Sequence, residues 1–274
     1  MPSRHAVFLP AILLLGLFLS ACGVDEDNNR DPYGLWVGEM KASDGDAAEI
    51  AVMAVTADGT AFIWRDDGVF WFRLRTNGRR FSVSHEAVSV AGSTWDGSSS
   101  YLTGTLDGTL QEPTDADYPD VTPGSAVDIA TGDRVITGSY TLGKEKGSLV
   151  FFNAPALSDH IVTPTALAGT WSSSDDPVEA LQNVTVIGDD GVFSGVNDAG
   201  CAYQGELELP EAGNIMKVTS VSAQCPRYED VGLNGQLNGG SGVAFMLDTA
   251  NQYLVMLWVF DWVNYGRAEI LVRQ

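Results

Sequence analysis

The sequence predicts an all-β protein built from two tandem small antiparallel up-and-down β-barrels, with a single larger β-sandwich as the alternative. Three observations lead to this fold class. After the N-terminal segment, no extended stretch shows the 3.6-residue apolar period of an amphipathic helix. Short strand patterns alternate instead with Asp-Gly and Asn-Gly turns, in which glycine supplies a positive φ. The pattern Gly-x-Trp also occurs twice, and each copy, Gly34-Leu35-Trp36 and Gly169-Thr170-Trp171, opens one series of strands.

The first series fills residues 33–153, which we expect to form an N-terminal barrel domain. Turns at Asp58-Gly59, Asp67-Gly68 and Asn77-Gly78 separate its early strands. Seven further strands are expected after the opening strand. The total of about eight strands suits a small barrel. The strands expected after the opening one are 48–56, 60–65, 69–75, 81–90, 101–106, 134–142 and 148–153.

The second series fills residues 167–274, the expected C-terminal barrel domain. Residues 154–166, with Pro155 and Pro164, are the expected linker between the domains. The longest apolar run, from Tyr253 to Phe260, has eight residues and suits a strand buried on both faces. The strands expected after the opening one are 181–187, 192–197, 201–209, 215–224, 233–237, 243–247, 253–262 and 268–272.

The N-terminus begins with a positive charge and a short apolar stretch. Arg4 precedes a run of 14 residues, Ala6 to Leu19, which fits the core of a signal peptide and is too short for a membrane-spanning helix. The tetrapeptide Leu19-Ser20-Ala21-Cys22 resembles the lipobox of bacterial lipoproteins. The resemblance implies that residues 1–21 are a lipoprotein signal peptide, cleaved before a Cys22 that carries diacylglycerol and an acylated amine. An ordinary secretory signal is the alternative.

Residues 22–32 are too polar to bury and are expected to form an acidic tether behind the lipid anchor at Cys22. In lipoproteins of this type, an aspartate at the second mature position usually marks retention in the inner membrane. Gly23 occupies that position here, so the resemblance implies delivery to the outer membrane. The periplasmic and the surface face of that membrane both stay open.

The formal net charge of −21 limits the partners. Such an acidic surface repels nucleic acid and anionic lipid headgroups. We therefore expect no nucleic-acid partner. It would attract cations or a basic protein, although solubility alone also explains it. After the N-terminal segment no apolar run of 18 residues occurs, so no second membrane-spanning helix is expected.

The hairpin about Asp66-Asp67-Gly68 suggests a contact surface. Pairing Trp64 with Phe70 and Phe62 with Phe72 places these four side chains in the core. The other face then carries Ile63, Trp71, Arg73 and Arg75. Trp71 among cationic neighbours is a candidate ligand or partner contact, and the alternative is an exterior tryptophan covered by a loop.

Cys201 and Cys225 are predicted to meet across adjacent strands. A hairpin turn near Gly213 places residues whose numbers sum to about 426 opposite one another, as these two do. In an oxidising periplasm the bridge would stabilise the fold by about 3 kcal/mol. A redox or metal role is the alternative. With Cys22 lipidated, no free thiol would remain.

Gly-x-Trp on the first strand of a small barrel resembles the opening of calycins, the lipocalin and avidin superfamily. The second copy is the closer match, because Asp190-Gly191-Val192-Phe193-Ser194-Gly195 follows it. The resemblance implies that the tryptophan plugs the closed end of each barrel. Residues 147–153, 166–171 and 200–205 also resemble segments of β-rich envelope lipoproteins of Gram-negative bacteria.

Catalytic and metal-binding patterns are weak in this sequence. His85-Glu86 lacks the second histidine of a zinc-protease helix, and no Gly-x-Ser-x-Gly elbow occurs. Asp115, Asp117 and Asp120 are weak calcium candidates in the long loop 107–131, for which a merely solvated acidic loop is the alternative. No cofactor is expected.

These patterns predict a non-catalytic binding or interaction module, anchored in the outer membrane and engaging an envelope protein. The first alternative is a lipocalin-type carrier of a small apolar ligand, which requires a hollow barrel. The second is an enzyme such as a hydrolase, which requires a cleft with converging carboxylates or a nucleophile held by a base.

Overall fold

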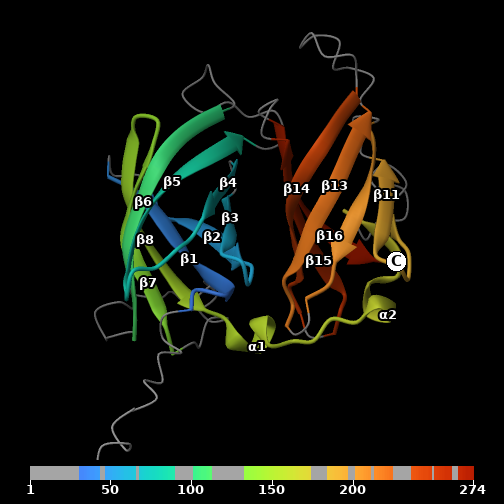
Figure 1. The fold of residues 1–274 in the computed structure, drawn as a ribbon, viewed down its shortest axis with the longest axis horizontal. Coiled ribbons are helices and arrows are strands. Elements are labelled where there is room, and N and C mark those ends of the chain that lie inside the picture. The colour runs from blue at the N-terminus through green and yellow to red at the C-terminus, as the bar shows by residue number, and fades with distance from the viewer. Residues whose placement is uncertain are drawn as a thin grey trace, which may run out of the picture.

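The structure is a computed structural model that describes residues 31–43, 47–65, 68–89, 101–112, 133–173, 184–196, 201–210, 213–224, 236–248, 250–260 and 265–274. It contains two closed antiparallel barrels in tandem, which confirms the predicted fold class (Figure 1). The helices of the described residues are too short to cross a membrane.

The first barrel comprises β1 to β8, each paired with its neighbour in sequence, and the pairing of β1 with β8 closes it. The strands are β1 Gly34–Ala42, β2 Glu49–Val55, β3 Thr60–Arg65, β4 Gly68–Arg73, β5 Arg80–Ser89, β6 Tyr101–Gln111, β7 Val135–Leu142 and β8 Glu145–Asn153.

The second barrel comprises β9 to β16, and the short β9 closes it by pairing with both β10 and β16. The strands are β9 Gly169–Ser172, β10 Val184–Ile187, β11 Val192–Val196, β12 Ala202–Glu208, β13 Met216–Gln224, β14 Gln236–Met246, β15 Tyr253–Phe260 and β16 Tyr265–Arg273.

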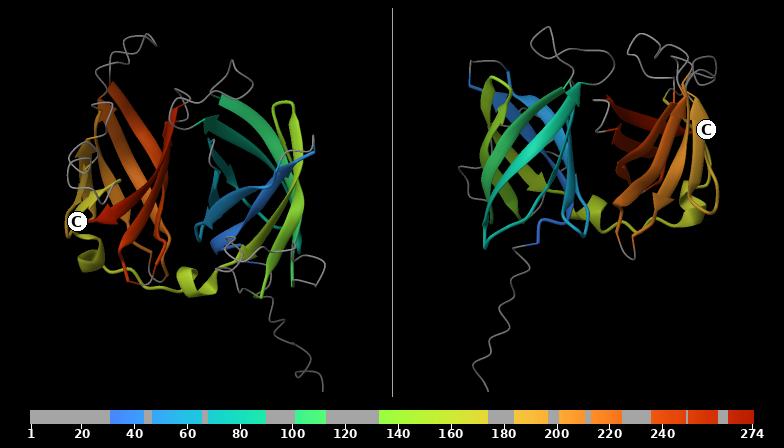
Figure 2. Two further views of the ribbon diagram at one scale, coloured as in Figure 1. Left: turned by 180° about the vertical axis from the view of Figure 1, so that it is seen from behind. Right: turned by 45° about the horizontal axis from the view of Figure 1, so that its top comes forward.

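Two single-turn helices, α1 Pro155–Ser158 and α2 Pro164–Leu167, connect the barrels along one end of the pair (Figures 1 and 2). Each begins with proline, whose fixed φ suits the first helical position. The Thr163 side chain caps α2 by accepting a hydrogen bond from the Ala166 amide.

Both Gly-x-Trp motifs begin with a glycine that the backbone requires. Gly34 has a φ of +130° and Gly169 a φ of +143°, a region that residues with side chains rarely adopt. Two residues later, Trp36 and Trp171 point into their barrels and are fully buried.

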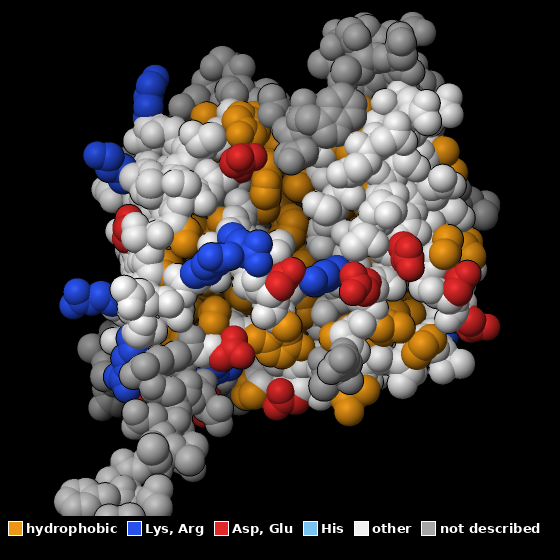
Figure 3. Space-filling view, viewed as in Figure 1, with side chains coloured by type: hydrophobic (Ala, Val, Ile, Leu, Met, Phe, Trp, Pro, Cys, Tyr) orange, Lys and Arg blue, Asp and Glu red, His pale blue; other side chains and the backbone are white. Residues whose placement is uncertain are grey.

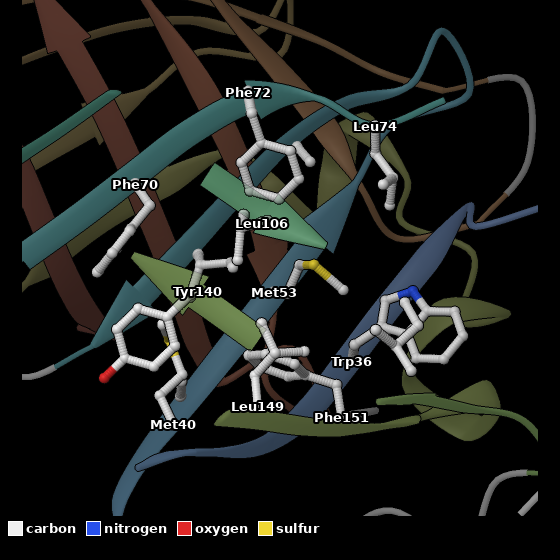
Figure 4. Packing of buried hydrophobic residues seen from close by; sticks show 14 of the residues in the cluster. Trp36, Met40, Met53, Phe70, Phe72, Leu74, Leu106, Tyr140, Leu149 and Phe151 are labelled. Carbon is white, nitrogen blue, oxygen red and sulfur yellow. The ribbon is translucent and has the colours of Figure 1, made fainter. Parts of the chain in front are cut away.

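Trp36 closes the end of the first barrel at which β1 begins. Its indole Nε1–H donates to the Pro32 carbonyl at 2.9 Å, and the Arg134 guanidinium lies 5.2 Å from its ring centroid. Behind it the inward side chains pack into one apolar cluster, in which Trp36 and Tyr140 lie far apart (Figure 4).

Trp171 is held in the same way in the second barrel. Its Nε1–H donates to the Leu167 carbonyl at 2.8 Å, and Arg273 lies 5.5 Å from its ring centroid. The Arg273 guanidinium also donates to the carbonyls of Ala166 at 2.6 Å and Ala168 at 2.9 Å. The repeated motif therefore has a repeated role.

A third apolar cluster joins the outer faces of the two barrels, and we call it the barrel interface. Burying one large apolar side chain contributes roughly 1.5–3 kcal/mol, so this cluster makes the barrels one body. Its buried members are Leu35, Val37, Ala54, Phe62, Val69, Val88, Val135, Phe152, Ala154, Ile215, Val243, Phe245, Val255, Leu257 and Val259.

Polar contacts flank the barrel interface. Lys217 of the second barrel pairs with Asp58 of the first at 2.8 Å. Ser158 of α1 links both barrels, because its hydroxyl accepts from the Leu35 amide at 2.8 Å and its carbonyl accepts from the Asn214 amide at 3.1 Å.

The pairing of β3 with β4 shows that the predicted hairpin register was wrong by one residue. The prediction placed Trp64 opposite Phe70 and Phe62 opposite Phe72, with all four in the core. In the structure Ile63 lies opposite Phe70. Ile63, Phe70 and Phe72 point into the barrel, whereas Phe62 and Trp64 belong to the barrel interface.

The reason for this error is that both faces of β3 and β4 are apolar. A hydrophobic pattern specifies a register only where one face is polar, and here the second barrel covers the outer face. Trp71 was expected on the outer side and does lie there. The run from Tyr253 to Phe260 forms β15, and all but its first residue are buried, as predicted for a strand covered on both faces.

We predict that Phe62→Ala lowers the free energy of unfolding by about 3 kcal/mol, because it leaves a cavity between the barrels. Ile50→Ala is the control, since Ile50 lies on the neighbouring strand β2 and is 50 % exposed. Its expected cost is within about 0.5 kcal/mol. Urea unfolding checks both, and equal midpoints for the two variants would argue against a cohesive interface.

Candidate functional site

The interiors of both barrels are filled with side chains. The cavity inside the first barrel has a volume of about 10 Å³, room for about one water molecule. In the second barrel, Tyr203, Trp258, Phe193 and Phe260 form a chain of ring contacts with centroids 5.4 to 6.4 Å apart. A lipocalin-type carrier needs a hollow interior, so these packed cores do not support that alternative.

A buried arginine occupies the end of the first barrel opposite Trp36. Arg65 is 3 % exposed and pairs with Glu49 at 3.0 Å and with Glu145 at 2.9 Å. The Tyr140 hydroxyl donates to the same Glu145 carboxylate at 2.5 Å. Burial, helped by this carboxylate, raises the pKa of Tyr140 above its ordinary value, so the phenol stays protonated. This network of ion pairs and hydrogen bonds fills the end of the first barrel with polar side chains.

The second barrel repeats this arrangement. Arg267 points inward from β16, pairs with Glu269, and lies 4.9 Å from the ring centroid of Tyr203. The Tyr203 hydroxyl is 2.6 Å from the Thr185 hydroxyl. We did not predict these inward arginines, although each falls at an inward position of its strand alternation.

His85 also lies inside the first barrel, on β5. It is 2 % exposed and its ring centroid is 5.3 Å from that of Phe70. Its Nε2–H donates to the Thr141 carbonyl at 2.8 Å. Burial lowers the pKa of His85 below its ordinary value of 6.5, since charging the ring would place a cation in the core.

The outer wall of the first barrel carries an open groove of about 540 Å³, which we call the β5 groove because it lies over β5. Outward side chains of β4, β5 and β6 form its walls, with the small Ser84 at its centre. The lining residues are the outward-facing Trp71, Arg73, Ser84, Glu86, Thr103 and Thr105, together with Phe72, His85 and Gly104 between them.

Trp71 and Arg73 take different positions in this groove. Trp71 is half-buried, packs against the barrel interface, and has its ring centroid 6.3 Å from that of Tyr101. Arg73 is exposed, and its Nη2 donates to the Asp58 carbonyl at 3.2 Å. The structure therefore places these two candidate contact residues side by side on one open wall.

Arg75 lies beyond the groove on the same hairpin, and Arg79 and Arg80 follow at its tip and at the start of β5. All are exposed, and with Arg73 we call them the arginine row. Figure 3 shows Lys and Arg side chains beside the barrel interface, with Asp and Glu side chains next to them. Only Arg73 and Arg75 of this row were predicted from the sequence as contact residues.

A second open groove, of about 610 Å³, lies on the outer wall of the second barrel over β10 to β14. Its lining side chains are all uncharged, and Val186 and Val196 on its walls are each about half exposed. We did not predict this surface from the sequence.

Several predicted site residues lie outside the described residues. These are the lipidation candidate Cys22, the calcium candidates Asp115, Asp117 and Asp120, and Cys225. Within the described part of the chain, no group of three or more His, Cys, Asp or Glu could hold a metal ion.

The register next to the predicted disulfide agrees with the prediction. Ala202 pairs with Gln224, whose numbers sum to 426, and a bulge shifts the pairing only after Gln204. Cys201 directly precedes this pair and is buried. The bridge from Cys201 to Cys225 stays a prediction, which the protein mass before and after reduction would test.

Comparisons with known proteins give one structural similarity. The sequence matches no family model and no curated protein. One solved structure is similar, a double mutant of the vaccine antigen Transferrin Binding Protein B from Haemophilus parasuis Hp5. The identity is 9 %, the TM-score is 0.27, and the match covers 89 % of this chain and 77 % of that one. At this TM-score the similarity carries no information about the function of this chain.

We predict that the protein loses stability as the pH falls from about 7 to about 5, partly through His85. Its folded pKa lies below the unfolded value of 6.5, so the unfolded chain binds the proton more tightly. His85→Gln should flatten this part of the profile, with the partly buried His160 exchanged in the same way as a control. Urea midpoints across the range test this, and profiles of equal slope would contradict it.

Proposed function

We propose that this chain is an outer-membrane-anchored lipoprotein that works as a non-catalytic binding module in the cell envelope and engages a protein partner. The β5 groove is the proposed contact surface. The observation that carries this proposal is the position of Trp71 and Arg73 on an open outer wall, while both barrel interiors are filled.

The chemistry of the groove suits protein recognition. Tryptophan, tyrosine and arginine dominate the energetic centres of protein interfaces. Trp71 and Arg73 line this groove, and Tyr101 contacts the Trp71 ring beside it. The packing of Trp71 fixes its ring before a partner arrives, so little side-chain entropy remains to be lost on binding. Ser84 leaves the space that a partner's side chain would fill.

The lipid anchor is proposed at Cys22, from the resemblance of Leu19-Ser20-Ala21-Cys22 to a lipobox. Two or three acyl chains would hold the protein on the membrane, since each buried CH₂ contributes about 0.8 kcal/mol. Residues 22–32 would connect the anchor to β1, at the end of the first barrel that Trp36 closes.

We predict that Cys22→Ser prevents incorporation of radiolabelled palmitate and moves the protein from the membrane fraction to the soluble periplasmic fraction. Gly23→Asp is the matched variant, because it should keep the lipid and redirect the protein to the inner membrane. Fractionation of cells expressing each variant measures both. Membrane association that survives Cys22→Ser would contradict the anchor.

We predict that Ser84→Trp fills the β5 groove and lowers partner capture at least tenfold in intact cells. Ser148→Trp is the matched control, because Ser148 is also an exposed serine on the outer face of the first barrel but lies on β8, away from the groove. Capture is measured by chemical crosslinking and purification, with the partner quantified against this chain. Absence of a stoichiometric partner, or equal capture by both variants, would reject this surface.

A further inference from the structure

We propose that the partner segment lying in the β5 groove is acidic, and that its carboxylates bind the arginine row. This inference rests on the proposed function and specifies the chemistry of its partner. Four exposed arginines lie close together on a chain that is otherwise acidic.

The basic residues of this chain are few and unevenly placed. The chain has 36 acidic and 15 basic residues, and the four members of the arginine row fall within the eight residues from Arg73 to Arg80. All four are arginine, the side chain that binds carboxylates in a bidentate manner. An acidic ligand is repelled by most of the surface and attracted here, which favours a single docking position.

The backbone holds the arginine row in place. Leu74 is buried between Arg73 and Arg75, so strand alternation turns both arginines outward. At the tip, Asn77 pairs with Arg80, and the Leu110 amide donates to the Arg79 carbonyl at 2.7 Å. The row therefore belongs to a hydrogen-bonded hairpin.

The guanidinium groups are available to a ligand. Arg73 donates to the carbonyl of Asp58, which leaves its charge uncompensated by that contact. The Asp58 carboxylate is engaged by Lys217 instead, and hydrogen bonding to Lys217 lowers the Asp58 pKa below its ordinary value. Among the described residues, no ion pair involves Arg75, Arg79 or Arg80.

The groove also sets the direction in which such a segment lies. Glu86 is paired with Trp71 across β4 and β5, so one part of the groove has its own carboxylate. The carboxylates of the partner should therefore lie at the Arg73 side and continue towards Arg75. An uncharged or aromatic part of the segment would then cover Trp71.

A narrow acidic segment fits better than a broad anionic surface. A membrane or a nucleic-acid duplex presents negative charge across a whole face, so it would also meet the acidic surface around the row. A single extended segment can reach the arginines while the rest of the partner stays beyond the Debye length, about 8 Å at physiological salt.

The test uses the mature chain without its lipid, made with Cys22 replaced by serine, and fluorescently labelled peptides of equal length that are acidic, neutral or basic. Anisotropy should show binding of the acidic peptide alone, weakening steeply as salt is raised. Arg73→Glu with Arg75→Glu should weaken it at least about tenfold. Lys144→Glu with Lys146→Glu is the control, because it changes the charge equally on an exposed strand turn at the other end of the same barrel.

Three results would overturn the inference. The first is equal affinity for the acidic, neutral and basic peptides. The second is an equal loss of affinity for the acidic peptide in the arginine and lysine variants. The third is binding to phosphatidylglycerol vesicles that depends on the arginine row and is stronger than binding to the peptide. Crosslinking in cells separates this inference from the proposed function. If Ser84→Trp abolishes capture of the partner but the arginine variant still captures it, the proposed function is supported and the acidic segment is rejected. Peptide binding without any cellular partner rejects the function instead.

Discussion

The apolar contact between the outer faces of the two barrels is the constraint on which the rest of the structure depends. Phe62 and Phe152 of the first barrel and Phe245 and Leu257 of the second share one buried cluster. A closed barrel leaves no free strand edges, so the barrels can associate only through side chains. This contact removes one wall of each barrel from solvent and determines which walls stay open to a partner. The β5 groove lies beside the covered wall, which is why Trp71 can be packed and partly exposed at once.

The filled interiors direct function to the outside of the molecule. Each barrel is closed near one end by a tryptophan under an arginine, and each holds a second arginine paired with inward carboxylates. These paired charges satisfy one another in a region of low dielectric, so they serve packing and orientation. What can vary without loss of the fold is the part of the outer wall that the barrel interface leaves exposed. A barrel with a solid core is therefore a rigid support for a surface contact.

Much of the architecture could be predicted, because turn glycines and the repeated Gly-x-Trp are local signals. Both barrels and the doubly buried β15 follow from them. The register of β3 on β4 could not be obtained, because a pattern that is apolar on both faces does not say which face is the core. The arginines over Trp36 and Trp171, Arg134 and Arg273, are about 100 residues away from them in sequence, so no local pattern predicts the contact. In the candidate site, Trp71 and Arg73 could be predicted from the sequence as neighbours on one face of a strand. The groove beside them could not, because three strands form it around Ser84.

The most direct test of this arrangement is the distance between the barrels in solution. Spin labels can be introduced as unnatural amino acids at the exposed Lys144 of the first barrel and Glu206 of the second, and their separation measured by pulsed electron paramagnetic resonance. One body held by the barrel interface gives a single narrow distribution, unchanged by moderate salt. A broad or divided distribution would mean that the barrels move independently, and it would contradict the shared apolar face that positions the β5 groove.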